Sequence, residues 1–309
     1  MALRDILVVL DASARNEARL TLAMALARRH GAGLNGFCAM GLLSAPEPAQ
    51  APPRYPEPFG LQGIANIAAE SPVSASAFES ITSTQADLAD RIGEAFRETA
   101  RQATLRATYE SDLGPPAASI VQRARTADLV VMGQPDPEDP HEQAARRAIE
   151  DVLLLGGRPV LVVPYAGNFP SVGKTVLIGW SETREAARAA HDALALMEPD
   201  AKATLLTIHR GPLTPEGEAL PAAEAARHFA RHGIDAEPAE TVPEAVGAPT
   251  VIVRPTVTEA GAFLNYASDL GADLLVIGGY GHSRARELVL GGMTRSLLNT
   301  TTLPLLMSH

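Results

Sequence analysis

The chain has 309 residues, 46% hydrophobic and 20% charged, which is the composition of a globular protein long enough for two domains. Its formal net charge of −10 argues against broad binding to nucleic acid or to anionic membranes, so a phosphorylated ligand would need a local positive feature. The single cysteine, Cys38, rules out an internal disulfide. The sequence lacks an apolar run of about 18 residues and does not start with a signal-peptide layout, so a cytoplasmic protein is expected.

Short apolar runs alternate with helical patterns along the first half of the chain. A proline- and alanine-rich insert, residues 42–72, interrupts this alternation and is expected to be a surface excursion, because it can continue neither a helix nor a strand. The runs predict strands at Ile6–Leu10, Gly33–Met40, Leu129–Met132 and Val160–Val163, and the helical patterns predict helices at Arg15–His30, Ala75–Arg106, Ala117–Thr126 and His141–Leu155.

The second half repeats this alternation. Strands are expected at Thr175–Trp180, Ala203–Ile208, Leu274–Ile277 and Leu303–Met307, and helices at Arg184–Met197, Glu218–His232, Glu259–Leu270 and Arg295–Asn299. The stretch "TVIVRP", Thr250–Pro255, fits either a strand or a loop. Continuous apolar strands indicate burial on both faces and therefore a parallel sheet covered by helices.

An internal repeat relates the two halves. "ADLVVMG" at Ala127–Gly133 recurs as "ADLLVIG" at Ala272–Gly278, 145 residues later, and Pro159 is followed by Pro304 at the same spacing. The starts "DILVVLDAS" and "KTVLIGWSE" also correspond. We therefore expect two tandem, doubly wound α/β domains, residues 1–168 and 169–309.

The stretch "IGGYGHSRARELVLGGMT", Ile277–Thr294, links the end of an apolar strand to the start of a helix. Its glycines allow backbone N–H groups to approach a phosphate, and the helix start near Met293 adds free N–H groups and a positive dipole end. Thr294 can cap that helix or donate to a phosphate oxygen, and His282 adds local positive charge, as do two arginines that follow it. The spacing fits neither a Walker loop nor a Rossmann fingerprint, and a glycine-rich turn without a ligand is the alternative interpretation.

The pattern G-x-x-G, nine residues, G-G after "ADLLVIG", with the opening "VLIGWSETREAARAA", resembles the universal stress protein family over nearly the whole chain. The resemblance implies tandem flavodoxin-like (adenine nucleotide alpha hydrolase-like) domains with five-stranded parallel sheets, and a role in resistance to stress. It implies a loop around the phosphates of ATP or another adenine nucleotide, with or without Mg²⁺, at Gly278, Gly281, Gly291 and Gly292. Met293 and Thr294 would then start the helix that donates to phosphate, and the end of the first strand, Trp180 and Ser181, would face adenine and ribose.

Two residues depart from the family pattern. Ser181 stands where nucleotide-binding members carry an aspartate, and Gly292 stands where a serine or threonine is usual. Since each hydrogen bond contributes about 1 kcal/mol, the two losses predict binding that is weaker by roughly one to two orders of magnitude.

The first half lacks most of the loop. Gly133 matches Gly278, but Asp136, Arg146 and Arg147 replace the other three glycines, and prolines and acids fill the stretch after Gly133. Missing N–H groups and negative charge both oppose anion binding, so no nucleotide is expected in the first domain. Asp11 and Ser13 remain there, and Asp11 is interpreted as a residue of the helix N-cap region.

The remaining candidates are interpreted as structural. His228 and His232 stand four residues apart on an expected helix, but no further ligand completes a metal site; Cys38 lies in an apolar run and is expected to be buried and inert. The last strands of the halves, Val160–Val163 and Leu303–Met307, are expected to pair and form a pseudo-dimer within one chain, which is compatible with a further homodimer. Alternative functions are a nucleotide-free signalling or scaffold protein, or a slow ATP hydrolase, for which the sequence shows no general base.

Overall fold

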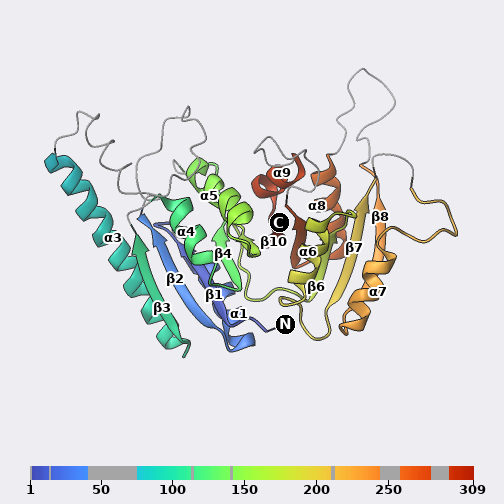
Figure 1. Ribbon diagram of the computed structural model, residues 1–309, viewed down its shortest axis with the longest axis horizontal. Helices are drawn as coiled ribbons and strands as arrows, with labels where there is room; N and C mark the ends of the chain where they lie inside the picture. Colours follow the sequence, from blue (N-terminus) through green and yellow to red (C-terminus); the bar gives the residue numbers. More distant parts are fainter. Residues whose placement is uncertain are drawn as a thin grey trace, which may run out of the picture. The chain divides into compact units, whose positions relative to one another are not determined.

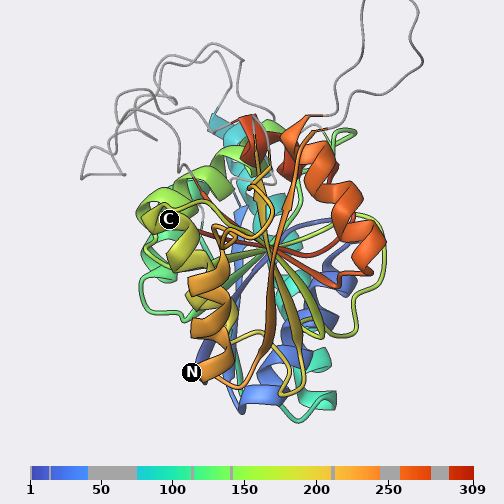
Figure 2. The same ribbon diagram turned by 90° about the vertical axis from the view of Figure 1, so that its right-hand side faces the viewer.

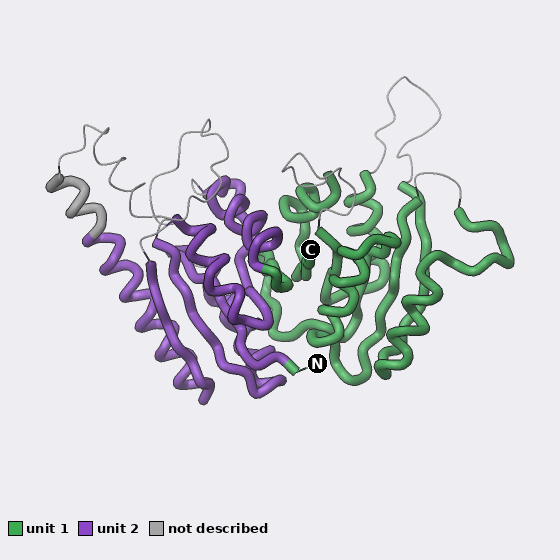
Figure 3. Tube along the Cα trace, viewed as in Figure 1, with its two compact units in different colours: residues 1–2, 157–309 green, residues 3–156 purple. Residues whose placement is uncertain are grey.

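The fold is given by a computed structural model. It describes residues 2–13, 15–40, 75–112, 115–139, 142–209, 213–243, 258–279 and 292–309, with the backbone alone for 75–82. The insert 42–72 and the stretch 250–255 lie outside these residues. The chain divides into two compact units, Leu3–Gly156 and Gly157–His309, called here the N-terminal and the C-terminal unit (Figure 3).

The N-terminal unit contains a parallel sheet in the order β3-β2-β1-β4 (Figure 1). Its strands are β1 (Asp5–Leu10), β2 (Gly33–Ala39), β3 (Ala107–Asp112) and β4 (Leu129–Gly133). The helices between and after them are α1 (Asn16–His30), α3 (Ala75–Gln102), α4 (Pro116–Ala124) and α5 (Glu142–Leu155). Strands β1 and β4 are buried on both faces, which is why their sequences are apolar without alternation.

The C-terminal unit has a parallel sheet in the order β10-β9-β6-β7-β8. Helices α7 and α8 lie on opposite faces of this sheet, as a doubly wound fold requires (Figure 2). The strands are β5 (Val160–Val163), β6 (Thr175–Gly179), β7 (Lys202–Ile208), β8 (Asp235–Thr241), β9 (Leu274–Gly278) and β10 (Leu305–Ser308), and the helices are α6 (Arg184–Ala193), α7 (Ala223–Arg231), α8 (Glu259–Leu270) and α9 (Gly292–Thr300). Among the described helices of the chain, none has both the length and the apolar character needed to cross a membrane.

Strand β5 belongs to the C-terminal unit. It pairs antiparallel with β10, with Leu161 opposite Leu306, so the expected pairing of these two strands is confirmed. The two compact units therefore divide before β5, whereas the boundary expected from the sequence, between residues 168 and 169, follows it. The pseudo-dimer remains a prediction.

The α/β fold class expected from the sequence is confirmed, but two strands were not predicted. These are β3 and β8, which lie at the outer edges of the two sheets as ordered above. Their residues are half-buried or exposed, and β8 contains Pro238, which has no N–H to donate and is tolerated at a sheet edge. A search for continuous apolar runs finds central strands and misses such edge strands.

Candidate functional site

The carboxyl edge of the C-terminal sheet collects several of the residues predicted as a binding site. Trp180 and Ser181 directly follow β6. The backbone N–H of Trp180 donates to the backbone carbonyl of Leu206 at 2.8 Å, which extends the hydrogen-bonded pairing of β6 with β7 by one residue. Strand β9, which ends at Gly278, pairs with the other side of β6. The structure thus brings Trp180, Ser181 and Gly278 to one edge. Gly281, His282 and Gly291 lie outside the described residues.

Gly278 is required by packing. A Cβ at this position would lie 2.5 Å from the backbone nitrogen of Ala186 and 2.6 Å from the carbonyl carbon of Glu185, both in the first turn of α6. That turn can therefore cross the end of β9 only where no side chain is present. Gly292, by contrast, starts α9 in open space, since a Cβ there meets nothing within 4 Å.

Helix α9 is anchored by its apolar face. Leu297 and Leu298 are fully buried, and Thr294, in the first turn, is buried as well, while Met293 is half-buried. The helix thus begins where the glycine stretch ends, as the sequence predicts.

The first turn of α6 carries both a cap and a charge. The Thr183 hydroxyl accepts from the Ala186 N–H at 3.3 Å and lies 3.4 Å from the Ser181 hydroxyl. Burial acts to raise the pKa of Glu185, but the hydrogen bond from Arg184 and the charges of Arg184 and His309 outweigh it, so this pKa lies below its ordinary value. Glu185 is therefore ionised at neutral pH, and a phosphate at this edge must avoid its carboxylate.

A polar network at the ends of β7 and β8 was not predicted from the sequence. His209 Nε2 lies 3.0 Å from Glu240 Oε2, and Thr214 donates its hydroxyl to the same oxygen at 2.7 Å and its N–H to both carboxylate oxygens. The hydrogen bond from the Thr214 hydroxyl is the main reason that the pKa of Glu240 lies below its ordinary value. Because β8 was not recognised as a strand, no sequence signal placed Glu240 beside His209.

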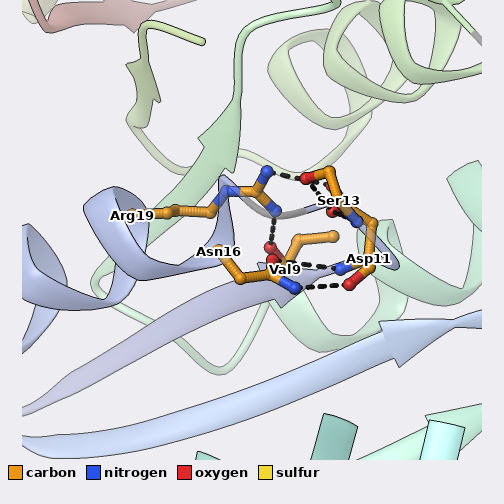
Figure 4. Close-up of polar contacts among 5 residues, drawn as sticks. All are labelled: Val9, Asp11, Ser13, Asn16 and Arg19. Carbon is orange, nitrogen blue, oxygen red and sulfur yellow. Dashed lines mark hydrogen bonds and ion pairs between the residues drawn. The ribbon is translucent and has the colours of Figure 1, made fainter. Parts of the chain in front are cut away.

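The equivalent edge of the N-terminal unit is closed by an ion pair (Figure 4). Arg19 Nη2 donates to Asp11 Oδ2 at 2.9 Å and its Nη1 donates to the Val9 carbonyl, while Asp11 Oδ1 accepts from the N–H and the hydroxyl of Ser13 at 2.9 and 2.5 Å. Burial acts to raise the pKa of Asp11, but the charge of Arg19 and the hydrogen bonds from Ser13 and Arg19 outweigh it, so the pKa lies below its ordinary value. Both oxygens of this carboxylate are therefore engaged within the unit.

The same guanidinium covers the end of β4. A Cβ on Gly133 would lie 2.1 Å from Arg19 Nη2, so the arginine lies directly over the counterpart of Gly278. Beside it, Arg15 and Asp136 form an ion pair at 2.5 Å. The interpretation of Asp11 as an N-cap residue is corrected here, because α1 has Arg15 at its N-cap and no side-chain cap.

His228 lies on α7 and His232 is the C-cap residue of that helix. The rings of His228 and His232 are 4.7 Å apart, and the ring of His191 on α6 is 6.3 Å from that of His232. Within the described ranges, no three residues of the types His, Cys, Asp or Glu are arranged to hold a metal ion.

Parallel sheets with helices between the strands, and polar side chains at the strands' carboxyl ends, define a flavodoxin-like α/β protein. Residues 173–309 match the model of the Universal stress protein family. These residues lie in the C-terminal unit and make up less than half of the chain, so the similarity to this family is shown for that part of the chain alone.

Individual proteins are similar to this chain in sequence or in structure. The chain is 44% identical to Universal stress protein Slr1230 of Synechocystis sp. (strain ATCC 27184 / PCC 6803 / Kazusa) over 45 residues, which make up 15% of this chain and 16% of that protein. A universal stress protein from Archaeoglobus fulgidus DSM 4304 has a similar structure, with a TM-score of 0.65, 12% identity, and coverage of 98% of this chain and 95% of that one. The functionally unknown protein PA1789 from Pseudomonas aeruginosa PAO1 aligns with a TM-score of 0.52 and 14% identity over 99% of this chain and 92% of its own. At these identities the structural likeness shows the fold alone.

Proposed function

We propose that the C-terminal unit binds an adenine nucleotide, as a ligand or regulator of a stress-response protein, and that the N-terminal unit does not. The observation that carries the proposal is the placement of the two elements on either side of the glycine stretch. Strand β9 ends at Gly278 on the carboxyl edge and α9 starts at Gly292, so the stretch between them joins a strand end to a helix N-terminus. This is the position at which backbone N–H groups bind phosphate in doubly wound folds.

The contrast between the two edges supports the proposal. Gly278 leaves room for the first turn of α6, whereas its counterpart Gly133 lies under the Arg19 guanidinium. The carboxylate of Asp11, which in the family faces the nucleoside, is held by Arg19 and Ser13. A nucleotide in the N-terminal unit would have to break this ion pair. At the matching position of the C-terminal unit stands the uncharged Ser181, and no ion pair among the described residues involves it.

Nucleotide-dependent melting tests the proposal. A ligand at one hundred times its Kd stabilises the folded state by about 2.7 kcal/mol, which corresponds to a rise in Tm of roughly 5–10 °C for a unit of this size. We expect such a rise with ATP, ADP or AMP at millimolar concentration.

The rise should disappear in Gly281→Asp, which introduces the residue found at the matching position of the first half. The matched control, Asp136→Asn, changes the N-terminal unit and should retain the rise. If none of the three nucleotides changes the Tm of the wild-type protein, the proposal is refuted and a nucleotide-free scaffold is favoured. The same melting experiment with Mg²⁺ added separates a metal–nucleotide complex from the free nucleotide.

A further inference from the structure

Three histidines from two helices come together on the surface of the C-terminal unit. The rings of His228 and His232 have their centres 4.7 Å apart, and the ring of His191, on α6, lies 6.3 Å from that of His232. His191 and His232 are exposed, and His228 is half-buried. We call these three residues the histidine cluster. The sequence shows only the pair on α7, because the third member belongs to another helix.

The spacing of the rings can be compared with that of imidazoles on a metal ion. Two imidazoles bound to one tetrahedral Zn²⁺, with Zn–N bonds of about 2 Å, have ring centres about 5 Å apart. The pair on α7 has this separation already. His191 has to approach by about 1 Å, which a rotation of an exposed side chain provides. As the rings stand, no three described ligands converge on one ion, so binding requires the rings to turn.

The ring nitrogens of the histidine cluster are not engaged by other side chains. Among the described residues, none of the three imidazoles has a hydrogen-bond or ion-pair partner, and their contacts are those between rings. His209 in the same unit differs, because its Nε2 lies 3.0 Å from the carboxylate of Glu240. An ion at the cluster would therefore displace no contact with a described residue.

The charges around His228 favour its neutral form. Burial and the charges of His232, Arg231 and His191 all lower the pKa of this imidazole, so the ring is neutral at pH 7. A neutral imidazole has the free electron pair that a metal ion requires. Arg231 repels a bound cation as well as a proton.

The charges on α6 and the end of α7 complete this environment. On α6, Arg188 and Asp192 flank His191 in the sequence and lie 3.7 Å apart as an ion pair, so their charges largely cancel. His228 lies in the last turn of α7 and His232 at its C-cap, where the helix dipole favours a positive charge.

The cluster lies at the amino end of β8. Only Gly233 and Ile234 separate His232 from Asp235, the first residue of that strand. The proposed nucleotide site is at the opposite, carboxyl edge of the sheet. The histidine cluster is therefore a separate feature, and an inference from it does not depend on the proposed function.

We propose that the histidine cluster binds one divalent transition-metal ion, with His228 and His232 as ligands from α7, His191 as the ligand that joins from α6, and water in the remaining position. Imidazole nitrogen selects Cu²⁺, Ni²⁺ and Zn²⁺ over Mg²⁺ and Ca²⁺, which prefer oxygen ligands. A bound ion ties the end of α7 to α6.

Calorimetric titration of the whole chain, produced without a histidine tag, tests this site. We expect one ion per chain for Cu²⁺, Ni²⁺ and Zn²⁺, with Cu²⁺ bound most tightly and no binding of Mg²⁺. His228→Gln, His232→Gln and His191→Gln should each weaken Zn²⁺ by about tenfold or more, since each removes one ligand. The matched control is His30→Gln, which removes a histidine of the N-terminal unit and should retain the wild-type affinity.

Three further readouts separate ligation from a structural role. Without metal, the three cluster variants should have nearly the Tm of the wild-type protein, whereas excess Zn²⁺ should raise the Tm of the wild-type protein and of His30→Gln alone. Electron paramagnetic resonance of the Cu²⁺ complex should show coupling to three imidazole nitrogens in the wild-type protein and to two in His191→Gln. Because protons compete with metal for imidazole, the affinity should fall steeply between about pH 7 and pH 5.

The contrary outcomes are equally specific. The site is disproved if the wild-type protein binds none of the three metals, or if His228→Gln and His232→Gln bind them as tightly as the wild-type protein does. Wild-type affinity and three coupled nitrogens in His191→Gln would overturn the link between α6 and α7.

Discussion

Arg19→Met is expected to destabilise the N-terminal unit strongly. The Arg19 side chain is 5% exposed and that of Asp11 29%, so the pair lies between a surface and a fully buried ion pair. Removing the partner of a fully buried charge lowers the free energy of unfolding by about 3–5 kcal/mol, whereas a surface ion pair contributes about 0–1 kcal/mol. For this partly buried pair, the expected decrease in the free energy of unfolding is therefore about 2 kcal/mol. The unmet carbonyl of Val9 adds about 1 kcal/mol. The free energy of unfolding should therefore fall by about 3 kcal/mol, and the Tm by roughly 6–12 °C.

Denaturant unfolding and calorimetry measure this loss. Methionine retains the apolar stem of the arginine, so a cavity contributes little. Arg101→Met is the control in the same unit, because Arg101 is 73% exposed and pairs with Glu98 on one helix; its effect on the free energy of unfolding should be far smaller than that of Arg19→Met. The double variant Arg19→Met with Asp11→Asn should be more stable than Arg19→Met alone, since it removes the orphaned charge.

The pH dependence provides a second readout of the same ion pair. Because the pKa of Asp11 is depressed in the folded state, its contribution is fully present above the unfolded pKa of about 3.9 and is lost as the pH falls through the folded value. The difference in stability between the wild-type protein and Arg19→Met should therefore shrink as the pH falls below about 4. A change of less than about 0.5 kcal/mol at pH 7, or a double variant no more stable than the single one, would refute the reasoning.

Two further predictions concern packing and reactivity. Gly278→Ala should lower the free energy of unfolding by about 1–3 kcal/mol, because its Cβ would lie 2.5 Å from the α6 backbone. Gly292→Ala is the control and should change this free energy little, because its Cβ would meet nothing within 4 Å. Equal effects of the two variants in denaturant unfolding would contradict the assigned contact. Cys38 is fully buried, and burial raises the pKa of its thiol to about 11. A thiol reagent at pH 8 should therefore react with Cys38 only when the protein unfolds. Rapid labelling of the native protein would disprove the burial of this thiol.

Much of the fold follows from sequence because burial leaves a local pattern. Strands such as β1, β4 and β9 are enclosed by helices, so each is a continuous apolar run that can be recognised without its neighbours. The repeat at a spacing of 145 residues likewise needs only the sequence, and it shows that the glycines after Gly278 have no equivalents after Gly133. Strands β3 and β8 carry weak patterns because edge strands are half-buried, and they were missed.

The side chains at the two carboxyl edges depend on contacts between distant residues. The sequence around Arg19 does not indicate that its side chain covers Gly133, which lies more than one hundred positions later in the chain. It also does not indicate that Arg19 donates a hydrogen bond to the Asp11 carboxylate. Likewise, Trp180, Thr207 and Ser308 form one row only because strand order and register align β6, β7 and β10 with β9. The sequence by itself determined the α/β class, the repeat and the glycine stretch, since each is local or periodic. Only the tertiary structure decided that one edge is closed by an ion pair and that the other holds polar atoms with no partner among the described residues, because hydrogen-bond satisfaction depends on what the fold brings together.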